Sequence, residues 1–147
     1  MIYYIYVAFF ILLILQIVSL FSNYWYVNGN NSWGLYNRCS GNTCMSISSY
    51  KENKAILDTM KVFLSLSIAI SCIVLLMIYF KYGERHINKV LGLSSVLMLI
   101  SLLLSVKIRS VSYYGDKQTG TPGSALYVCL SALVINSSLV YIFSVKK

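Results

Sequence analysis

Charged residues are scarce in this 147-residue sequence, and acidic residues are the scarcest. Asp, Glu, Lys and Arg make up 11% of the chain, and only four residues are acidic. The surface of a small soluble domain is roughly 25–35% charged, so this composition does not suit a protein that folds in water. Apolar residues make up 58% of the chain, more than the roughly half that soluble domains contain. The composition indicates an integral membrane protein.

Groups that carry chemistry are also scarce. The single histidine, His86, has no cysteine or carboxylate at ligand spacing, so we expect no metal site. The sequence shows no paired carboxylates, no phosphate-binding glycine loop and no nucleophile with a base, so we expect no enzyme and no cofactor. No Asp or Glu lies deep in an apolar segment, which argues against a pump or an ion-coupled transporter.

The few charges are mostly positive. Twelve Lys and Arg residues give a formal net charge of +8, but they are scattered over the loops and the ends of the apolar segments. A nucleic-acid-binding protein would gather them into a stripe or a recognition motif, so we expect no nucleic acid partner. The distribution favours the lipid bilayer as partner, through its anionic headgroups.

Long apolar segments account for most of the chain. A bilayer core of about 30 Å is crossed by about 20 apolar residues in a helix, and four segments have that character. The predicted single domain, residues 1–147, comprises a first span (2–21), a first loop (22–58), a second span (59–80), a short loop (81–89), a third span (90–107), a second loop (108–122) and a fourth span (123–145). The first segment has no basic leader and no clear cleavage site, so we expect a retained span rather than a signal peptide.

Charge and cysteine placement together predict the orientation. Basic residues are densest in loop 81–89 and in the tail Lys146–Lys147, although the other two loops hold more of them in total. Cys39 and Cys44 lie in a polar loop where they would be oxidised outside the cell, and Asn30 begins a glycosylation sequon in the same loop. We therefore expect a multi-pass protein of the plasma membrane with both termini in the cytoplasm, and Asn30 as a candidate glycosylation site.

The first loop has turns and alternating residues in place of continuous apolarity. These features predict three short strands, over residues 24–27, 32–39 and 44–50. Trp33, Leu35 and Cys39 would share one face at period two. A bridge between Cys39 and Cys44 would clamp the hairpin tip and stabilise it by about 2 kcal/mol, and their spacing is not that of a C-x-x-C redox centre. Trp25, Trp33 and Leu35 are expected to pack onto the outer ends of the helices.

Small and polar residues inside the spans predict close helix packing. In a bilayer, helices associate through small residues that let backbones approach and through shared hydrogen bonds. Ser67 and Ser71 in the second span, and Ser101 and Ser105 in the third, are pairs of small residues four apart that would let helix backbones approach. The polar side chains expected to form hydrogen bonds across helices are Gln16, Asn136 and Ser137. At the start of the second span, Asp58 and Lys61 are three residues apart and are expected to form an ion pair.

The first loop also resembles a known signature. Trp25, the run Trp33–Cys39 (WGLYNRC) and Cys44 are similar to the claudin pattern of a Trp, then GLW-x-x-C, then a second Cys. Residues 54–60 resemble the entry to the second span in that family, and residues 123–128 resemble the start of its last helix. The chain resembles a short, divergent member of the superfamily of claudins, peripheral myelin protein and epithelial membrane proteins.

The resemblance implies the fold and the residues of the motif. The implied fold is a membrane all-α four-helix bundle with a small extracellular antiparallel β-sheet in the first loop. The implied motif residues are Trp25, Trp33, Gly34, Leu35, Tyr36, Cys39 and Cys44. The sequence departs from the family pattern at Tyr36, which stands for the Trp of GLW, and in the short segment between the cysteines, so we expect a reduced sheet.

Function is implied by the resemblance alone. A claudin-like protein would serve cell–cell adhesion, a barrier or membrane organisation through its extracellular loops, with copies of itself or another membrane protein as partner. If the loops line a path between cells, Arg38, Lys51 and Lys54 would favour anions. Two alternatives stay open: a lateral auxiliary subunit of a channel or receptor, and a viral envelope protein of claudin-like fold.

Overall fold

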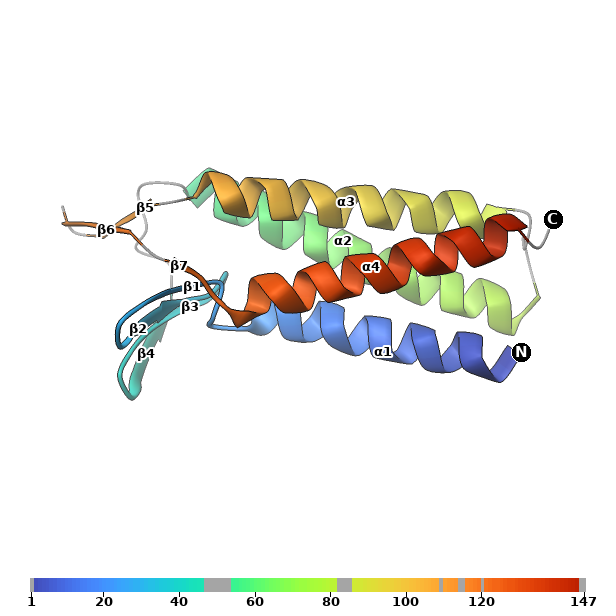
Figure 1. Cartoon of the computed structure of the whole chain (residues 1–147), viewed down its shortest axis with the longest axis horizontal. Coiled ribbons are helices and arrows are strands. Elements are labelled where there is room, and N and C mark those ends of the chain that lie inside the picture. Colours follow the sequence, from blue (N-terminus) through green and yellow to red (C-terminus); the bar gives the residue numbers. More distant parts are fainter. Residues whose placement is uncertain are drawn as a thin grey trace.

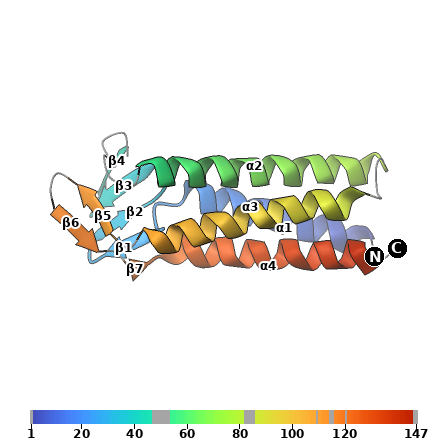
Figure 2. The same ribbon diagram turned by 90° about the horizontal axis from the view of Figure 1, so that it is seen from above.

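The computed structural model describes residues 2–46, 54–81, 86–108, 110–113, 116–119 and 121–145. Four long helices lie side by side: α1 (Ile2–Phe21), α2 (Lys54–Tyr79), α3 (Ile87–Lys107) and α4 (Ser124–Val145). α1 begins and α4 ends at one end of the bundle, here named the terminal end, and the strands lie at the other, the sheet end (Figures 1 and 2). Each helix is long and apolar enough to cross a membrane, by length and composition. The predicted four-helix bundle with a small antiparallel sheet is confirmed.

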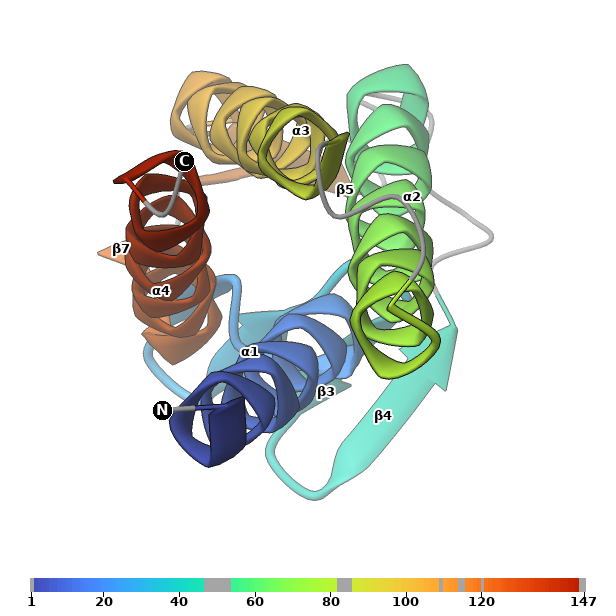
Figure 3. The ribbon, with the colours of Figure 1, turned by 90° about the vertical axis from the view of Figure 1, so that its right-hand side faces the viewer.

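The helices surround a common axis in the order α1, α2, α3, α4, and each packs against two neighbours (Figure 3). Each buries a stripe at helical spacing. In α1, Phe9, Leu12 and Gln16 are buried, whereas Phe10 and Ile14 are exposed. Lipid tails are as apolar as these outward side chains, so a bilayer solvates a surface that would associate in water.

Two helices begin before their predicted spans, α2 at Lys54 and α3 at Ile87. The spans were predicted from the absence of charge, but the helices begin where inward burial begins. Leu57, Met60 and Ile87 are all buried, and the charged residues near them lie on other faces of the same helices. Helical periodicity therefore extends beyond the charge-free segment.

One predicted polar contact in α4 is wrong. Ala132, Asn136 and Leu139 are buried at helical spacing, whereas Ser137 is exposed. Consecutive residues lie about 100° apart around a helix, so the residue after an inward-facing Asn136 points away from the axis. Ser137 faces outward and makes no contact across the bundle.

The strands form two separate sheets at the sheet end. The larger consists of β1 (Tyr26–Asn28), β2 (Asn31–Trp33), β3 (Asn37–Ser40), β4 (Thr43–Ser46) and β7 (Thr121–Pro122), in the antiparallel order β4-β3-β2-β1-β7. The smaller is the hairpin of β5 (Ser110–Tyr113) and β6 (Asp116–Thr119). Two-residue turns join β1 to β2 and β3 to β4, and their first residues, Gly29 and Gly41, have φ of 57° and 56°. Positive φ at this position is typical of tight hairpin turns, and glycine adopts it without strain.

The second predicted strand is in fact two strands. Its middle forms a turn, because the Gly34 N–H donates to the Asn37 carbonyl oxygen (2.8 Å). The reversed chain pairs Trp33 with Arg38, so Cys39 lies on the opposite face from Trp33. The prediction that Trp33 and Cys39 share a face is wrong, since the alternation restarts at the turn.

The sequence-based prediction of three strands did not include β7, the last strand of the sheet in chain order. β7 comes from the second loop and pairs with β1, with Tyr26 opposite Pro122 and Val27 opposite Thr121. This pairing joins segments almost a hundred residues apart, which local alternation does not reveal. The third predicted strand is found as β4 over Thr43–Ser46, and residues 47–50 lie outside the described residues.

Candidate functional site

The junction between sheet and bundle contains most of the motif residues. The chain leaves α1 through residues 22–25, and this segment passes between two glycines. A Cβ added at Gly34 would meet the Ser22 carbonyl oxygen and lie 2.7 Å from Asn23 Cα. A Cβ at Gly123 would meet the Tyr24 carbonyl oxygen and lie 2.7 Å from its carbon. Backbone lies directly against backbone at both places, so only glycine fits.

Backbone hydrogen bonds fix the same segment to the sheet and to α4. The Trp25 N–H donates to the Trp33 carbonyl oxygen (2.9 Å), and the Gly123 N–H donates to the Trp25 carbonyl oxygen (2.9 Å). The Ala125 N–H, in the first turn of α4, donates to the Tyr24 carbonyl oxygen (3.1 Å). The N–H groups of a helix's first turn have no partner within the helix, so the segment also caps α4.

Two aromatic side chains attach the sheet to the ends of other helices. Trp25 is fully buried, and its Nε1–H donates to the Ser19 carbonyl oxygen in the last turn of α1 (2.8 Å). The Tyr26 hydroxyl donates to the Ser105 carbonyl oxygen near the end of α3 (2.7 Å). Both acceptors are in last turns, where carbonyl groups lack the partner that a further turn of helix would supply. The Ser105 carbonyl oxygen also accepts the N–H of Ile108, directly after the helix (3.2 Å). Burial raises the pKa of Tyr26 well above its ordinary value.

The turn between β2 and β3 reaches α1 and α2. Leu35 is fully buried in the core. The Tyr36 ring stacks on Phe21, with centroids 5.4 Å apart, and the Lys61 ammonium lies 5.2 Å from the Tyr36 centroid. Lys61 also contacts the Asp58 carboxylate at 3.0 Å, which confirms the predicted ion pair. Tyr36, at the position of the family's Trp, therefore lies between an aromatic ring of α1 and a cation of α2.

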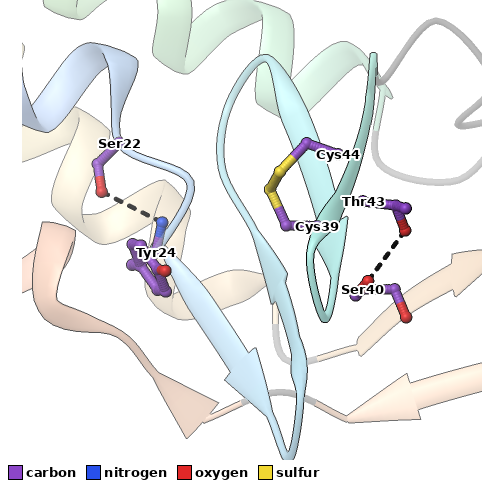
Figure 4. The surroundings of a disulfide bond; sticks show 6 residues. All are labelled: Ser22, Tyr24, Cys39, Ser40, Thr43 and Cys44. Carbon is purple, nitrogen blue, oxygen red and sulfur yellow. Dashed lines mark hydrogen bonds between the residues drawn. A yellow bond between two sulfur atoms is a disulfide. The ribbon is translucent and has the colours of Figure 1, made fainter.

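The predicted disulfide between Cys39 and Cys44 is confirmed (Figure 4). The two residues lie directly opposite each other in β3 and β4. The next pair toward the turn, Ser40 and Thr43, is also linked, because the Thr43 hydroxyl donates to the Ser40 carbonyl oxygen (3.0 Å). The hairpin tip is therefore clamped twice within a few residues.

Of the three candidate charged residues, the structure describes Arg38 and Lys54, which lie in β3 and at the start of α2. Arg38 lies with its guanidinium carbon 5.7 Å from the Trp33 ring centroid, on the sheet face that Trp33 and Tyr26 share. Lys54 is the exposed first residue of α2, and Lys51 lies outside the described residues. Within the described ranges, no three His, Cys, Asp or Glu side chains gather as metal ligands would.

Asn30, the candidate glycosylation site, is exposed in the turn between β1 and β2. Its carbonyl oxygen accepts the N–H of Gly41 from the turn between β3 and β4 (3.0 Å). The two hairpin turns are therefore neighbours at the same end of the strands. Ser32, the third residue of the sequon, is buried in β2.

Sequence reasoning missed Tyr26 as an attachment point. Its hydroxyl bonds to a backbone oxygen 79 residues away, and no local pattern marks such a partner. Gly123 was noticed only through the family resemblance, because a glycine before an apolar segment is also an ordinary turn residue.

Comparison with protein families agrees with this geometry. The model of the PMP-22/EMP/MP20/Claudin family matches residues 1–139. No curated protein matches the chain. The match includes all four helices except the last turns of α4, and it includes every strand and both glycines of the junction. The chain is a multi-pass membrane protein that belongs to the PMP-22/EMP/MP20/Claudin family.

Proposed function

We propose that this protein is a claudin-like, non-enzymatic adhesion or barrier protein whose sheet contacts copies of itself. In this proposal the sheet end lies outside the cell and both termini lie in the cytoplasm of a cell whose plasma membrane the helices cross. The disulfide supports that orientation, since disulfides persist in oxidising compartments.

The observation that carries the proposal is that all four helices hold the sheet. The attachments are Trp25 to Ser19 in α1, Tyr36 to Lys61 in α2, Tyr26 to Ser105 in α3, and Tyr24 to Ala125 in α4. A sheet fixed at so many places keeps its orientation to the membrane. Contact between copies benefits from such a surface, because little conformational freedom is lost on binding.

The two neighbouring hairpin turns, residues 29–30 and 41–42, form the surface proposed for contact between cells. Asn28, Asn30, Asn42 and Thr43 are exposed there, and all are uncharged. The chain as a whole carries a formal charge of +8, so most approaches between two copies are opposed by repulsion. Amide side chains both donate and accept hydrogen bonds, so the turn surfaces of two copies can form hydrogen bonds with each other.

The test expresses the protein in cells that do not otherwise adhere and measures its enrichment where cells touch, with freeze-fracture imaging of strands. Enrichment only between two expressing cells is expected. A variant with Asn30→Arg and Asn42→Arg should lose that enrichment, and contact with cells carrying Asn30→Asp and Asn42→Asp should restore it. Asn88→Arg, at the terminal end, is the matched control. Diffuse distribution of the unchanged protein at every contact would exclude self-assembly.

Ion preference is a further part of this proposal. Lys51 and Lys54 would favour anions along a path between cells, and the effect would be weakened by salt. Arg38 lies over the Trp33 ring, so we expect Arg38→Gln to change permeability less than Lys54→Gln. Measured cation preference in expressing cell layers would contradict this part.

The second candidate function is lateral binding to a channel or receptor. The shortness of the β3–β4 hairpin favours it, because only two residues separate the paired strands and the sheet offers little area. In that case a single expressing cell suffices, and the partner would be recovered after crosslinking in the membrane without any neighbouring cell. The alternative of a viral envelope protein has no supporting feature among the described residues.

A further inference from the structure

A polar cluster inside the bundle links three helices. The Gln16 amide nitrogen of α1 donates to the Ser67 hydroxyl of α2 (2.9 Å) and to Met98 Sδ of α3 (3.4 Å). The Ser67 hydroxyl lies 2.7 Å from the Ser94 hydroxyl of α3. All four side chains are at most 1% exposed, so the cluster is closed to lipid.

The hydrogen bonds of this cluster leave one amide oxygen without a partner. The Ser67 hydroxyl accepts from Gln16 and also forms a hydrogen bond with the Ser94 hydroxyl, in which either oxygen can be the donor. The Ser94 hydroxyl also lies 3.4 Å from the Ser67 carbonyl oxygen. Ser71 donates to that same carbonyl (3.0 Å). Gln16 Oε1 is buried and has no hydrogen-bond partner among the described residues. Turning the amide over would only exchange this unpaired acceptor for an unpaired donor.

A second buried amide lies beside the same turn of α3. Asn136 of α4 is fully buried, and its nitrogen donates to the Ser95 hydroxyl (3.1 Å) and to the Leu91 carbonyl oxygen (3.4 Å). Asn136 Oδ1, like Gln16 Oε1, has no partner in the described part of the chain. Because Ser94 and Ser95 are consecutive, the cluster around Gln16 and the side chain of Asn136 reach the same turn of α3.

An amide oxygen inside a bilayer needs a donor from within the protein, because lipid tails offer none. A lipid headgroup or a partner helix cannot reach side chains that are 0–1% exposed. Water is small enough to be enclosed on folding, and it commonly lies beside buried polar groups that are otherwise unsatisfied. We propose that the side-chain amides of Gln16 and Asn136 are binding sites for internal water within the membrane-spanning bundle.

The test is solid-state NMR of the full chain in phosphatidylcholine bilayers, with glutamine labelled at the side-chain carbonyl carbon. The sequence has two glutamines, Gln16 and Gln118, so Gln118→Thr, outside the four helices, leaves one resonance. Magnetisation transferred from water protons to the Gln16 carbonyl supports the proposal. Its absence, while sites in the loops receive transfer in the same sample, overturns it.

Matched variants separate bound water from a loosened bundle. Ser137→Ala, on the outward face of α4, should leave the transfer unchanged. Asn136→Leu removes the second site and is expected to leave at least half of the magnetisation transfer to the Gln16 carbonyl. If Asn136→Leu abolishes that transfer while the folded fraction stays that of the unchanged chain, two separate sites are excluded and the proposal fails.

Discussion

Replacing Gly123 with alanine would put a methyl group against the backbone of the segment that leaves α1. The added carbon would lie 2.7 Å from the Tyr24 carbonyl carbon and 3.2 Å from Val27 Cγ2, besides meeting the Tyr24 carbonyl oxygen. A flexible side chain could turn away, but the Tyr24 carbonyl cannot, because it belongs to a backbone segment held between α1 and β1 and accepts the Ala125 N–H. The start of α4 must therefore move away from the sheet.

The movement breaks two hydrogen bonds, from Gly123 to Trp25 and from Ala125 to Tyr24. Each contributes about 0.5–1.5 kcal/mol net, and a buried group left without its partner costs about 1–3 kcal/mol. We expect Gly123→Ala to lower the free energy of unfolding by about 3 kcal/mol, which is roughly a hundredfold change in the folding equilibrium.

Tryptophan fluorescence measures this directly. The only two tryptophans, Trp25 and Trp33, are both buried at the junction, so denaturation in detergent micelles followed by their emission reports on the junction. Gly92→Ala is the control, because its Cβ would meet no described atom within 4 Å and alanine favours a helix by about 1 kcal/mol. An unchanged denaturation midpoint for Gly123→Ala would refute the backbone-contact reasoning.

Three further predictions concern the other attachments. Burial raises the pKa of Tyr26 above 10.0, so the stabilisation by its protonated hydroxyl is complete below pH 10 and is lost as the pH rises further. Tyr26→Phe should lower the free energy of unfolding by about 1 kcal/mol and should abolish this part of the loss of stability at alkaline pH. Denaturation midpoints on both sides of pH 10 measure both effects. Cys39→Ser with Cys44→Ser should cost about 2 kcal/mol, and a reductant should lower the midpoint of the unchanged protein only; equal response of both proteins would contradict this. Lys61→Met should lower the free energy of unfolding by at most about 1 kcal/mol, since Lys61 and its carboxylate partner are partly exposed. A double-mutant cycle with Tyr36→Leu should show a coupling energy between the two residues, and a coupling of zero would contradict a stabilising contact between the Lys61 ammonium and the Tyr36 ring.

The helices were predictable because a bilayer imposes a length and a polarity that sequence displays directly. α1 begins and ends at the bounds of the first apolar segment, Ile2 and Phe21. The disulfide was predictable as well, since Cys39 and Cys44 lie on both sides of a turn. The inward side of each helix was only partly predictable: Asn136 faces the bundle and Ser137 does not, and composition alone does not distinguish them.

The sheet was harder to predict because its order depends on contacts between remote backbone segments. Gly34 forms a turn in what alternation presents as one strand, and its reason for being glycine is the passage of Asn23 beside it. β7 has only two residues, Thr121 and Pro122, too few for a strand pattern. The positions of the Gly34 turn and of β7 are determined by tertiary packing, which local strand propensity does not predict.

The place of β7 in the sheet has a consequence for synthesis. β1 is made early and β7 almost last, so during translation the hairpins and their disulfide can form while one edge of β1 still lacks its partner. Only when residues 121 and 122 emerge, immediately before α4, is that edge covered. A chain truncated before β7 would leave that edge of β1 unpaired, and an unpaired strand edge can pair with another chain. The sheet can therefore be completed only after three of the four helices have been made, when the chain reaches the start of the last one.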